Sequence, residues 1–443
     1  MTIVDMRDMQ ARVQGAIDQG ATYFQDELTQ ANLDEFLSRF LSVGDFLLDL
    51  AWNIDANAMI QWAHDHGVIY LNTSLEEWEP YSGGPERSVQ SRTLYVRHMR
   101  IREMKSKWRE VGPTAIVEHG ANPGLVSHLV KKAMVDIATR AIAEGQAGRG
   151  VEDALASENF PKLAQNLGVK VIHIAERDTQ VADRPKLVGE FVNTWSVEGF
   201  YEEGIAPAEL GWGTHEKTLP ANAFHHEGGP QNQIAIAKAG ATTWVRSWVP
   251  NSETTGLLVR HGEAFTMSDH LTVWEKGEAV YRPTVHYAYC PSDAAIASMR
   301  ELEMRQWDLQ KNQRIMNDEI IDGEDRLGVL VMGHVYKSWW TGSLLSIHDA
   351  RKLIPHQSAT TVQVASAVYA AVAWAMKNPD RGLLVPDDLP WQEVLGYAEK
   401  YWGGYHSIAS DWDPLAARND LYRNWNGRKY DHDDPWQFSN FLV

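Results

Sequence analysis

Residues 46–73 read FLLDLAWNIDANAMIQWAHDHGVIYLNT, and this stretch predicts the architecture of the N-terminal part of the chain. An apolar run at Phe46–Trp52 precedes a helical pattern at Ala58–His66, and a second apolar run follows at Val68–Leu71. Two short β-rich runs joined by a helix are typical of a parallel sheet with a covering helix. We therefore expect a β-α-β unit here.

The same alternation of strand and helix extends on both sides of this unit. Strand-like runs lie at Thr2–Val4 and Thr114–Val117, and a helical pattern lies at Leu33–Leu41. Parallel strands end together at one edge of their sheet, which is where a dinucleotide binds in doubly wound folds. Asn53 and Thr73 follow two of the predicted strands, so they are candidates for contacts with a cofactor. The pattern predicts an α/β, Rossmann-like domain.

This predicted domain, residues 1–124, has no glycine-rich turn. Neither G-x-G-x-x-G nor G-x-x-x-x-G-K-[ST], which would hold the phosphates of a nucleotide, occurs in the chain. The opening MTIVD matches the pattern of the second strand of a dinucleotide fold, which ends in an acid for the ribose hydroxyls, here Asp5. An ordinary first strand is the alternative interpretation.

The first interpretation has two consequences. It implies that roughly 30 residues, half of a β-α-β unit, are missing ahead of Met1. The missing strand would be the central one, and its absence would leave unpaired sheet edges and exposed apolar surface. A carboxylate at Asp5 would also favour NAD over NADP, because it repels a 2′-phosphate.

After residue 124 the pattern becomes mixed α+β. Helices are predicted at Leu125–Glu144 and then up to Leu167, and a charged helix at Asp293–Met316. Strands of a mostly antiparallel sheet are predicted between them, in the runs VKVIHIAERD, FVNTWSVEGF, TTWVRSWVP and GLLVRHGEAF. We assign this second domain to residues 125–359.

Residues 360–443 form the third predicted part. It starts with an apolar helix at Thr360–Met376, which we expect to be buried. The last 60 residues are polar and aromatic with little periodicity. We expect this part to pack partly against the first domain.

Composition narrows the class of protein. The net charge of −18 argues against nucleic acid and anionic membrane as partners. The single cysteine, Cys290, excludes an intramolecular disulfide and a cysteine-rich zinc site, and it fits a reducing compartment. The start MTIVDMRDM lacks the pattern of a signal peptide. We therefore expect a cytoplasmic protein without a metal.

Long sequence blocks carry a family resemblance. They are HGANPGLVS at 119–127, VKVIHIAERDTQ at 169–180, FVNTWSVEGFYEEG at 191–204, VRHGEAFTMSDHLTVW at 259–274 and DGEDRLGVLVMGH at 322–334. In this order they resemble the bacterial homospermidine synthases, which are relatives of saccharopine dehydrogenase. The resemblance covers nearly the whole chain and stops short only at the front, where the glycine-rich turn is missing.

The resemblance implies an NAD-dependent transferase that forms a homodimer through its catalytic domain. Such enzymes couple two putrescine molecules, or related diamines and polyamines, into homospermidine and ammonia by oxidation to an imine, transimination and re-reduction. Two alternatives stay open. One is a related imine reductase of the saccharopine or carboxynorspermidine dehydrogenase type, and the other is a non-catalytic polyamine-binding remnant.

Such a reaction requires particular groups. A dication needs carboxylates near both ends, one ammonium must lose a proton to a positioned base, and an aromatic face suits the transient iminium. The matched blocks supply carboxylates at Glu176, Glu203 and Asp325 and an aromatic ring at Trp195. Without the resemblance, these residues would be surface acids, a turn cap and a core tryptophan.

Three further residues complete the predicted site. His261 and Glu263 are two positions apart, so they would share one face of a strand and could relay a proton. A surface pair is the alternative. Asn122 would orient the nicotinamide or the reacting amine, and otherwise it caps the helix that follows.

Overall fold

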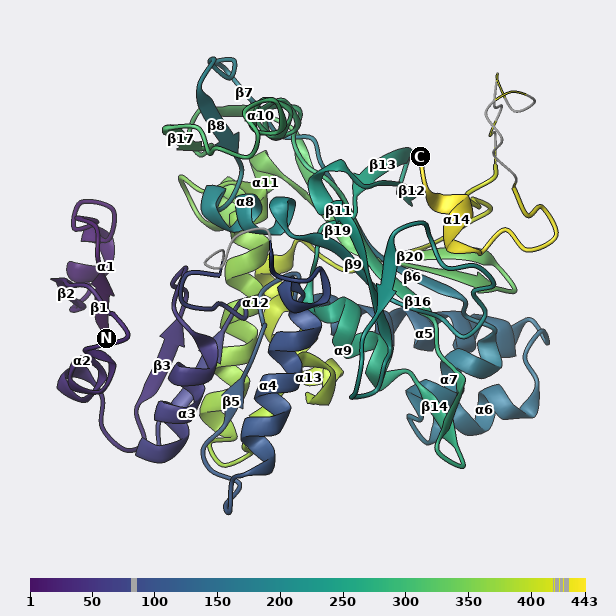
Figure 1. Cartoon of the computed structure of the whole chain (residues 1–443), viewed down its shortest axis with the longest axis horizontal. Helices are drawn as coiled ribbons and strands as arrows, with labels where there is room; N and C mark the ends of the chain where they lie inside the picture. The colour runs from purple at the N-terminus through teal and green to yellow at the C-terminus, as the bar shows by residue number, and fades with distance from the viewer. Residues whose placement is uncertain (81–85, 417, 419–421, 423–424, 426–429) are drawn as a thin grey trace.

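The computed structural model describes residues 1–80, 86–416, 418, 422, 425 and 430–443 (Figure 1). The predicted irregular C-terminal stretch therefore lies partly outside the described residues. The N-terminal elements are β1 (Thr2–Asp5), α1 (Gln14–Ile17), β2 (Thr22–Gln25), α2 (Leu33–Phe40), β3 (Phe46–Asp49), α3 (Ala56–His66), β4 (Ile69–Asn72), η2 (Gln90–Arg92), α4 (Leu94–Ser106) and β5 (Ala115–Ile116).

The middle of the chain contributes most of the strands. Its elements are α5 (Leu125–Ala143), α6 (Arg149–Ala156), α7 (Phe160–Leu167), β6 (Val171–Asp178), β7 (Val181–Ala182), β8 (Glu190–Asn193), α8 (Val197–Ile205), β9 (Pro207–Gly211), β10 (Ala223–His225), β11 (Gln233–Ala239), η3 (Gly240–Thr242), β12 (Trp244–Val249), β13 (Ser252–Leu257), α9 (Gly262–His270), β14 (Val273–Glu275), β15 (Glu278–Tyr281), β16 (Thr284–Cys290), α10 (Asp293–Met304), β17 (Asn312–Ile315), β18 (Ile320–Asp322), β19 (Glu324–His334), β20 (Lys337–Ser346) and α11 (Ile347–Leu353). The last elements are α12 (Ala359–Lys377), β21 (Leu383–Leu384), η4 (Pro386–Asp388), α13 (Trp391–Trp402), β22 (His406–Ser410) and α14 (Phe438–Phe441).

The predicted β-α-β unit is present as β3, α3 and β4. The side chain of Asp55 caps the helix by accepting a hydrogen bond from the backbone N–H of Ala58 at 2.8 Å. Gly67 ends the helix with a left-handed φ of 68°, a conformation that costs glycine little. β3 and β4 then pair in parallel. The alternation seen in the sequence is therefore confirmed as an α/β fold.

The parallel strands of this region form two separate sheets. β1 pairs with β2 alone, while β3, β4, β5 and β21 form a four-stranded sheet. Within the described residues no strand pairing joins β1 to β3, and Figure 1 shows β1 and β2 with α1 and α2 as a unit beside β3. The single parallel sheet expected for a Rossmann-like domain is therefore divided into two sheets here.

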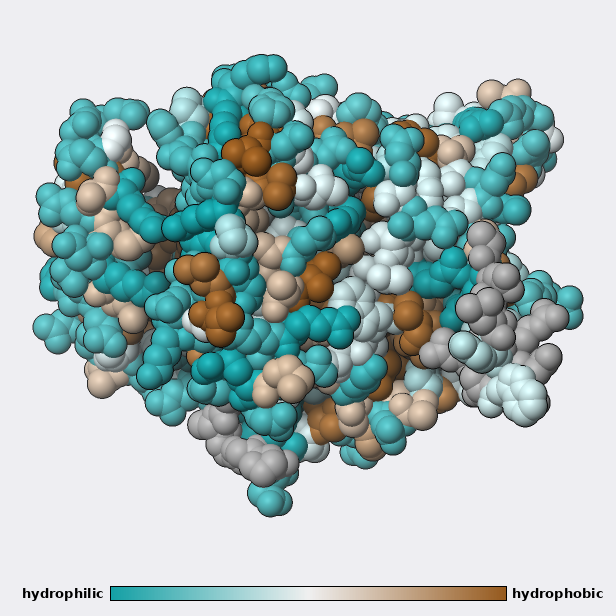
Figure 2. Space-filling model, turned by 90° about the horizontal axis from the view of Figure 1, so that it is seen from above, coloured by the Kyte–Doolittle hydropathy of each residue, from teal (hydrophilic) through white to brown (hydrophobic). Residues whose placement is uncertain are grey.

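Exposed apolar side chains accompany the unpaired edge of β3. Leu48 is 40% exposed, and Leu50 and Trp52 just beyond the strand are 62% and 44% exposed. By contrast, all four residues of β4 are buried. An ion pair between Arg7 and Glu198, 2.7 Å long, connects the β1–β2 unit to α8. Elsewhere, Figure 2 shows a face that is largely hydrophilic, with small and separate hydrophobic patches.

A ten-stranded mixed sheet forms the centre of the molecule. Its strand order is β10-β11-β9-β16-β6-β19-β20-β22, and β12 and β13 pair beside this path. β6 lies between β16, which is parallel to it, and β19, which is antiparallel. α5 and α12 pack on one face of this sheet, and Trp412, Phe438 and Phe441 belong to the apolar cluster on the other. Both faces of β6 are therefore buried.

Several predicted elements are wrong in detail. The strand expected over FVNTWSVEGF ends at Asn193, because Ser196 caps α8 through the backbone N–H of Gly199. The strand expected over GLLVRHGEAF ends at Leu257, and a helix, α9, begins at Gly262. The helix expected up to Met316 stops at Met304. The sequence patterns did not predict β2, α4, α13 and β22. They predicted one helix where the structure has two, α6 and α7.

The apolar helix α12 is buried, as its sequence predicts. It is the one helix among the described residues that is long and apolar enough to cross a membrane. However, it packs against α13 and the central sheet, and its N-cap hydroxyl, Ser358, donates to the carbonyl oxygen of Thr194 at 3.0 Å. These contacts identify it as a core helix.

Candidate active site

One face of β6 changes from apolar to acidic along the strand. Ile172 and Ile174 belong to the apolar core on this face, and Glu176 and Asp178 follow at the same two-residue spacing. The neighbouring strand β19 places Asp325 directly opposite Asp178. All three carboxyl groups are buried, and no ion pair to any of them occurs in the described part of the chain. A set of buried acids without cations is costly unless the acids are protonated or a cationic ligand binds.

Glu176 is held by two neighbours. Its Oε2 accepts a hydrogen bond from Nδ2 of Asn122 at 2.9 Å and another from the hydroxyl of Tyr287. The same amide group of Asn122 donates to the Tyr287 hydroxyl at 2.5 Å, which leaves Oδ1 as its remaining polar atom. Burial raises the pKa of Glu176 to about 7, although these two hydrogen bonds favour the carboxylate. The group can therefore gain or lose a proton near neutral pH.

Asp178 and Asp325 lie at the N-terminal end of α12. Thr360, in the first turn of that helix, donates its hydroxyl to Oδ2 of Asp325 at 2.5 Å, and Thr194 donates to Oδ2 of Asp178 at 2.6 Å. Gln180 bridges Asp178 and Thr360. Burial raises the pKa of both acids, and for Asp325 the neighbouring carboxylates raise it further. Oδ1 of Asp325 has no hydrogen-bond partner in the described residues.

Aromatic rings border the acids. Tyr289 lies opposite Glu176 on β16, and its ring stacks on that of Tyr287 with centroids 5.1 Å apart. Trp195, in the turn between β8 and α8, donates its indole N–H to the Tyr289 hydroxyl at 3.0 Å. The predicted position of Trp195 on a strand is wrong, but the turn brings the indole to the acidic face. Such rings can stabilise a cation beside them.

A histidine between two carboxylates lies next to this face. The ring of His261 contacts Tyr287 edge-on, with centroids 4.3 Å apart. Its Nε2 is 3.2 Å from Oε1 of Glu203, and its Nδ1 is 3.2 Å from Oε1 of Glu263. Burial alone would lower the pKa of His261, but the two carboxylates raise it well above its usual value. The imidazolium form is therefore favoured.

The predicted geometry of His261 and Glu263 is corrected in one respect. These residues do not share a face of a strand, because β13 ends at Leu257. His261 is the N-cap residue of α9, with extended backbone, and Glu263 lies in the first turn of that helix. The turn still brings the two side chains into contact. The negative charge of Glu263 is also favoured at a helix N-terminus.

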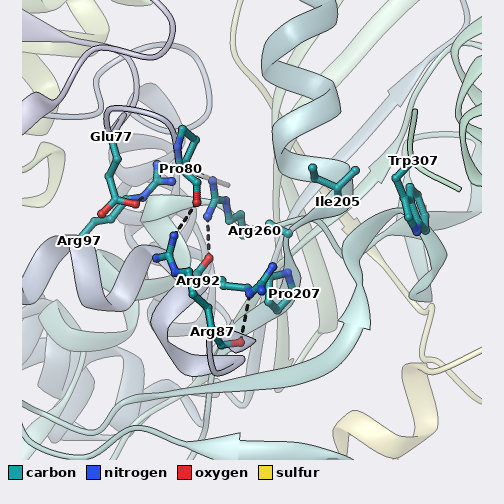
Figure 3. Close-up of a pocket in the computed structure, with 10 residues that line it drawn as sticks. Glu77, Pro80, Arg87, Arg92, Arg97, Ile205, Pro207, Arg260 and Trp307 are labelled. Atoms are coloured by element: carbon teal, nitrogen blue, oxygen red, sulfur yellow. Dashed lines mark hydrogen bonds and ion pairs between the residues drawn. The ribbon is translucent and has the colours of Figure 1, made fainter. Parts of the chain in front are cut away.

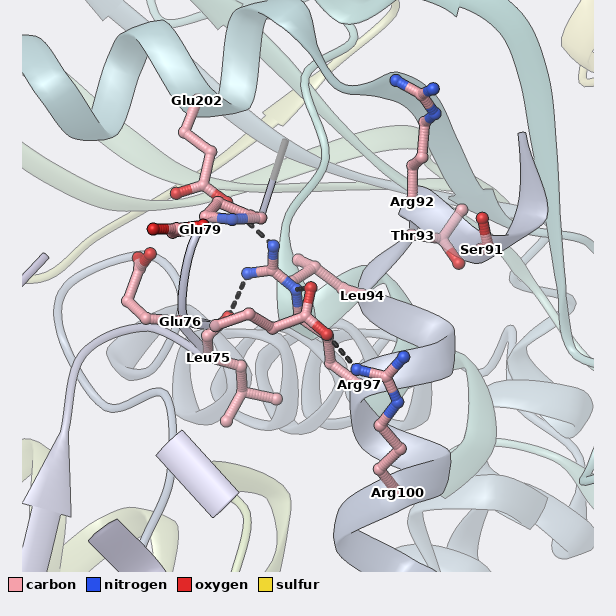
Figure 4. Close-up of polar contacts among 12 residues, drawn as sticks. Leu75, Glu76, Glu79, Ser91, Arg92, Thr93, Leu94, Arg97, Arg100 and Glu202 are labelled. Carbon is pink, nitrogen blue, oxygen red and sulfur yellow. Dashed lines mark hydrogen bonds and ion pairs between the residues drawn. The ribbon is translucent and has the colours of Figure 1, made fainter. Parts of the chain in front are cut away.

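Glu202, the sequence neighbour of Glu203, has a different environment. It forms ion pairs with Arg97, at 2.9 Å, and with Arg260, and all three side chains are buried. Burial would raise the pKa of Glu202, but the two guanidinium groups lower it to about 2. Arg97 also donates to the carbonyl oxygen of Leu75, so the network joins α8 to the segment that follows β4 (Figure 4). Glu202 therefore stabilises the fold through its ion pairs, whereas Glu203 pairs with His261 at the site.

A cavity of about 200 Å³ lies beside this network (Figure 3). Four arginines line it together with Glu77, and these arginines are Arg87, Arg92, Arg97 and Arg260. A cationic diamine would be repelled by such a wall. The cavity is therefore distinct from the acidic site around Glu176.

The cofactor candidates lie at the carboxyl ends of parallel strands. Asp5 ends β1, Thr73 follows β4 directly, and Asn53 lies four residues beyond β3. Asn53 has a left-handed φ of 62°, and its Oδ1 accepts a hydrogen bond from the N–H of Glu79 at 2.9 Å. A Cβ atom added to Gly120 would lie 3.7 Å from the methyl group of Thr73, so this edge approaches the turn that carries Asn122.

This donor set fits two parts of NAD. A carboxylate suits ribose hydroxyls, and amide and hydroxyl groups suit a carboxamide. The phosphate-binding turn is the part for which the sequence supplies no glycine-rich motif. The acidic face and the strand ends meet at Asn122, so a cofactor on this edge would point toward the buried acids.

Sequence reasoning missed several groups of the site. Tyr287, Tyr289 and Thr360 form hydrogen bonds with predicted residues, and Asp178 lies directly opposite Asp325 on the neighbouring strand. The alternation of Ile172, Ile174, Glu176 and Asp178 on one strand face was a signal for Asp178. The other three are brought in by strand pairing and helix packing over long sequence distances, so no local pattern marks them.

Two family models match the chain. One is described as the saccharopine dehydrogenase NADP binding domain and matches residues 1–116. The other is described as the saccharopine dehydrogenase C-terminal domain and matches residues 120–403. The two matches divide the chain close to the turn between β5 and α5.

Similar proteins span the whole chain. A homospermidine synthase from Blastochloris viridis is 39% identical, with 100% of this chain and 91% of that protein covered. A homospermidine synthase from Mesorhizobium japonicum is 40% identical, with 100% and 90% covered. A crystal structure of the homospermidine synthase of Legionella pneumophila in complex with NAD is 37% identical, with a TM-score of 0.87 and coverage of 100% and 91%.

Proposed function

The chain belongs to the homospermidine synthase family, and from this premise we propose that its acidic site joins two diamines. It is an NAD-dependent enzyme that couples two putrescine molecules into homospermidine and ammonia. When bound, NAD supplies a hydride acceptor for one diamine carbon and returns the same hydride to the new imine, so no net redox change results. The remaining steps are the work of the protein's own side chains.

The observation that carries the assignment of substrate is the set of three buried acids. Glu176, Asp178 and Asp325 have no ion-pair partner among the described residues, and burial raises the pKa of each. A diammonium ligand would supply the missing positive charge and lower these pKa values. The ammonium groups would also satisfy Oδ1 of Asp325.

The aromatic groups and His261 suit the other requirements. A planar iminium next to Trp195 and Tyr289 would be stabilised by the ring faces without a fixed anion. The amide of Asn122 holds Glu176 in one orientation through a 2.9 Å hydrogen bond. Glu203 with His261 provides a pair that can take the proton from a diamine ammonium before hydride loss.

A related imine reductase is the weaker alternative. Enzymes of that type bind amino acid carboxylates and need an arginine in the substrate site. The arginines next to site residues in the sequence pair with other acids: Arg177 with Asp293, Arg326 with Glu324 and Arg260 with Glu202. Calorimetric titrations of the protein with putrescine and with lysine, both with NAD present, therefore distinguish the two functions. We expect binding of putrescine and much weaker binding of lysine, and the reverse order would favour the reductase.

Assembly and location complete the proposal. We expect a cytoplasmic homodimer, as the family resemblance and the single buried cysteine suggest. Light scattering coupled to size exclusion would test the dimer. A mass of one chain at micromolar concentration would contradict it.

A further inference from the structure

Tyr287 belongs to the acidic site, and its ring is held from two sides. It lies on β16, and the ring of Tyr289 on the same strand stacks on it with centroids 5.1 Å apart. The ring of His261 contacts it edge-on, with centroids 4.3 Å apart. Tyr287 is only 3% exposed. These contacts hold the ring in one orientation, in which its hydroxyl group reaches Glu176.

The hydroxyl group of Tyr287 completes a triangle of hydrogen bonds. It donates to Oε2 of Glu176 and accepts from Nδ2 of Asn122 at 2.5 Å, and Nδ2 also donates to the same Oε2 at 2.9 Å. Burial and the charge of Glu176 raise the pKa of the Tyr287 hydroxyl well above its usual value, so this group stays protonated and remains a donor. Oε2 therefore receives two donors, whereas no hydrogen bond reaches Oε1 of Glu176 within the described residues.

Several titratable groups face Glu176 from β6, β19, β16 and the start of α9, and these groups are Asp178, Asp325, Tyr287, Tyr289 and His261. Burial has the largest effect on Glu176 and raises its pKa, and the charge of Asp178 raises it further. The hydrogen bond from Tyr287 is the largest of the effects that lower this pKa, and it exceeds that of the charge on His261. Tyr287 is thus the strongest single influence that favours the carboxylate.

We propose that Tyr287 is a positioning residue, which holds Glu176 as a carboxylate with Oε1 left for an ammonium group of the diamine. The proposal rests on the function proposed above, because it concerns the same substrate site. If Glu176 were protonated, its proton would lie on Oε1, since both donors occupy Oε2, and an O–H group there would oppose an ammonium group. A lysine or arginine in place of Tyr287 would also favour the carboxylate, but its positive charge would repel a dication.

The test is a Tyr287→Phe variant, with Tyr281→Phe as the matched control. Tyr281 is also buried, and its hydroxyl donates to the carbonyl oxygen of Val169 at 2.9 Å. The control therefore loses a comparable hydrogen bond without any change at a carboxylate. The Kd of putrescine is measured by calorimetry between pH 6 and 8.5 with NAD present. Thermal unfolding shows whether each variant is folded.

Tyr287→Phe should move the midpoint of the pH dependence upward by about one pH unit, because it removes a donor that favours the charged form of Glu176. A raised pKa leaves more of Glu176 protonated at pH 7, so the Kd of putrescine should increase about fivefold there. Near pH 8.5 the Kd should lie within about twofold of the wild-type value. The ionisation of putrescine is common to all the proteins and cancels in these ratios. Tyr281→Phe should keep the wild-type profile.

Two further proteins distinguish this role from a loss of packing. In a Glu176→Gln background, Tyr287→Phe should no longer change the pH dependence, because the group that titrates is absent. The second protein carries 3-fluorotyrosine at position 287. This residue keeps the ring and has a more acidic hydroxyl, which donates a stronger hydrogen bond to a carboxylate. It should therefore move the midpoint downward, opposite to the shift in Tyr287→Phe.

An unchanged midpoint in folded Tyr287→Phe would overturn the inference, and so would a Kd that increases equally at every pH. If Tyr287→Phe does not fold, the direction of the shift with 3-fluorotyrosine decides the question, and an upward shift or none would overturn the inference. Wild-type protein that binds no putrescine at any of these pH values and makes no homospermidine would contradict the proposed function, and with it this role of Tyr287.

Discussion

Asp325 lies directly opposite Asp178 across the antiparallel pair of β19 and β6. Directly opposed side chains on neighbouring strands project to the same face, so the two buried carboxyl groups belong to one site. Glu176 extends this site by one step along β6, and the hydroxyl of Thr360 closes it at the start of α12. The pairing of two strands therefore creates the charge that a diammonium substrate requires.

Putrescine binding should release protons near neutral pH. The pKa of Glu176 is about 7 in the free site, so part of the population is protonated there, and an ammonium ligand lowers that pKa. Affinity should therefore rise with pH up to and beyond 7 and fall about tenfold for each pH unit well below it. Calorimetric titration in buffers of different ionisation enthalpy measures the released protons.

Glu176→Gln provides the control for this experiment. The variant removes the group that titrates near 7, so its weaker binding should lose most of the pH dependence in this range. An affinity of the wild type that does not change between pH 6 and 8 would contradict the assignment of Glu176 to the ammonium.

Trp195→Ala should lower kcat/KM for putrescine by about tenfold or more, since it removes an aromatic face next to the iminium. The change also removes the hydrogen bond to Tyr289. Trp195→Phe keeps a ring and should lose less. The matched control is Trp274→Ala, because Trp274 is 48% exposed and lies on the β14–β15 hairpin. Equal kcat/KM values for Trp195→Ala and the control would show that the Trp195 ring does not stabilise the iminium.

The same substitution at two neighbouring glutamates should affect different properties, namely stability at Glu202 and turnover at Glu203. Glu202→Gln leaves the buried guanidinium groups of Arg97 and Arg260 without their shared carboxylate, which should cost about 3–5 kcal/mol of stability. Glu203→Gln should change stability much less and abolish most turnover, because it removes a proton acceptor beside His261. Chemical denaturation and steady-state kinetics of both variants measure this difference. A stable Glu202→Gln protein or an active Glu203→Gln protein would show that the roles are assigned wrongly.

Local sequence patterns predicted the elements that depend on near neighbours. The strand-helix-strand order of the first domain and the buried helix α12 follow from periodicity and capping, and both are present. A helix interrupts each of two expected strands and was missed, because runs as short as NTWSVEGF and RHGEAF do not distinguish a helix from a strand by periodicity. There, capping by Ser196 and tertiary packing determine the outcome.

The site was predictable only where the family resemblance named its residues. The contacts of Glu176 with Asn122 and of His261 with Glu203 join these predicted residues. The pairing of Asp178 with Asp325 depends on the register of strands that are far apart in the sequence, which no local pattern encodes.

The coupling of two diamines is tested most directly with putrescine that carries deuterium on both carbons next to nitrogen. The enzyme is incubated with this substrate and unlabelled NAD, the product is identified by mass spectrometry, and NADH is followed by absorbance. We predict homospermidine that keeps all the deuterium of its two parent molecules, with no accumulation of NADH, because the hydride removed from one carbon returns to that carbon. Stoichiometric NADH without homospermidine, or no product from folded protein with NAD bound, would contradict the proposed function.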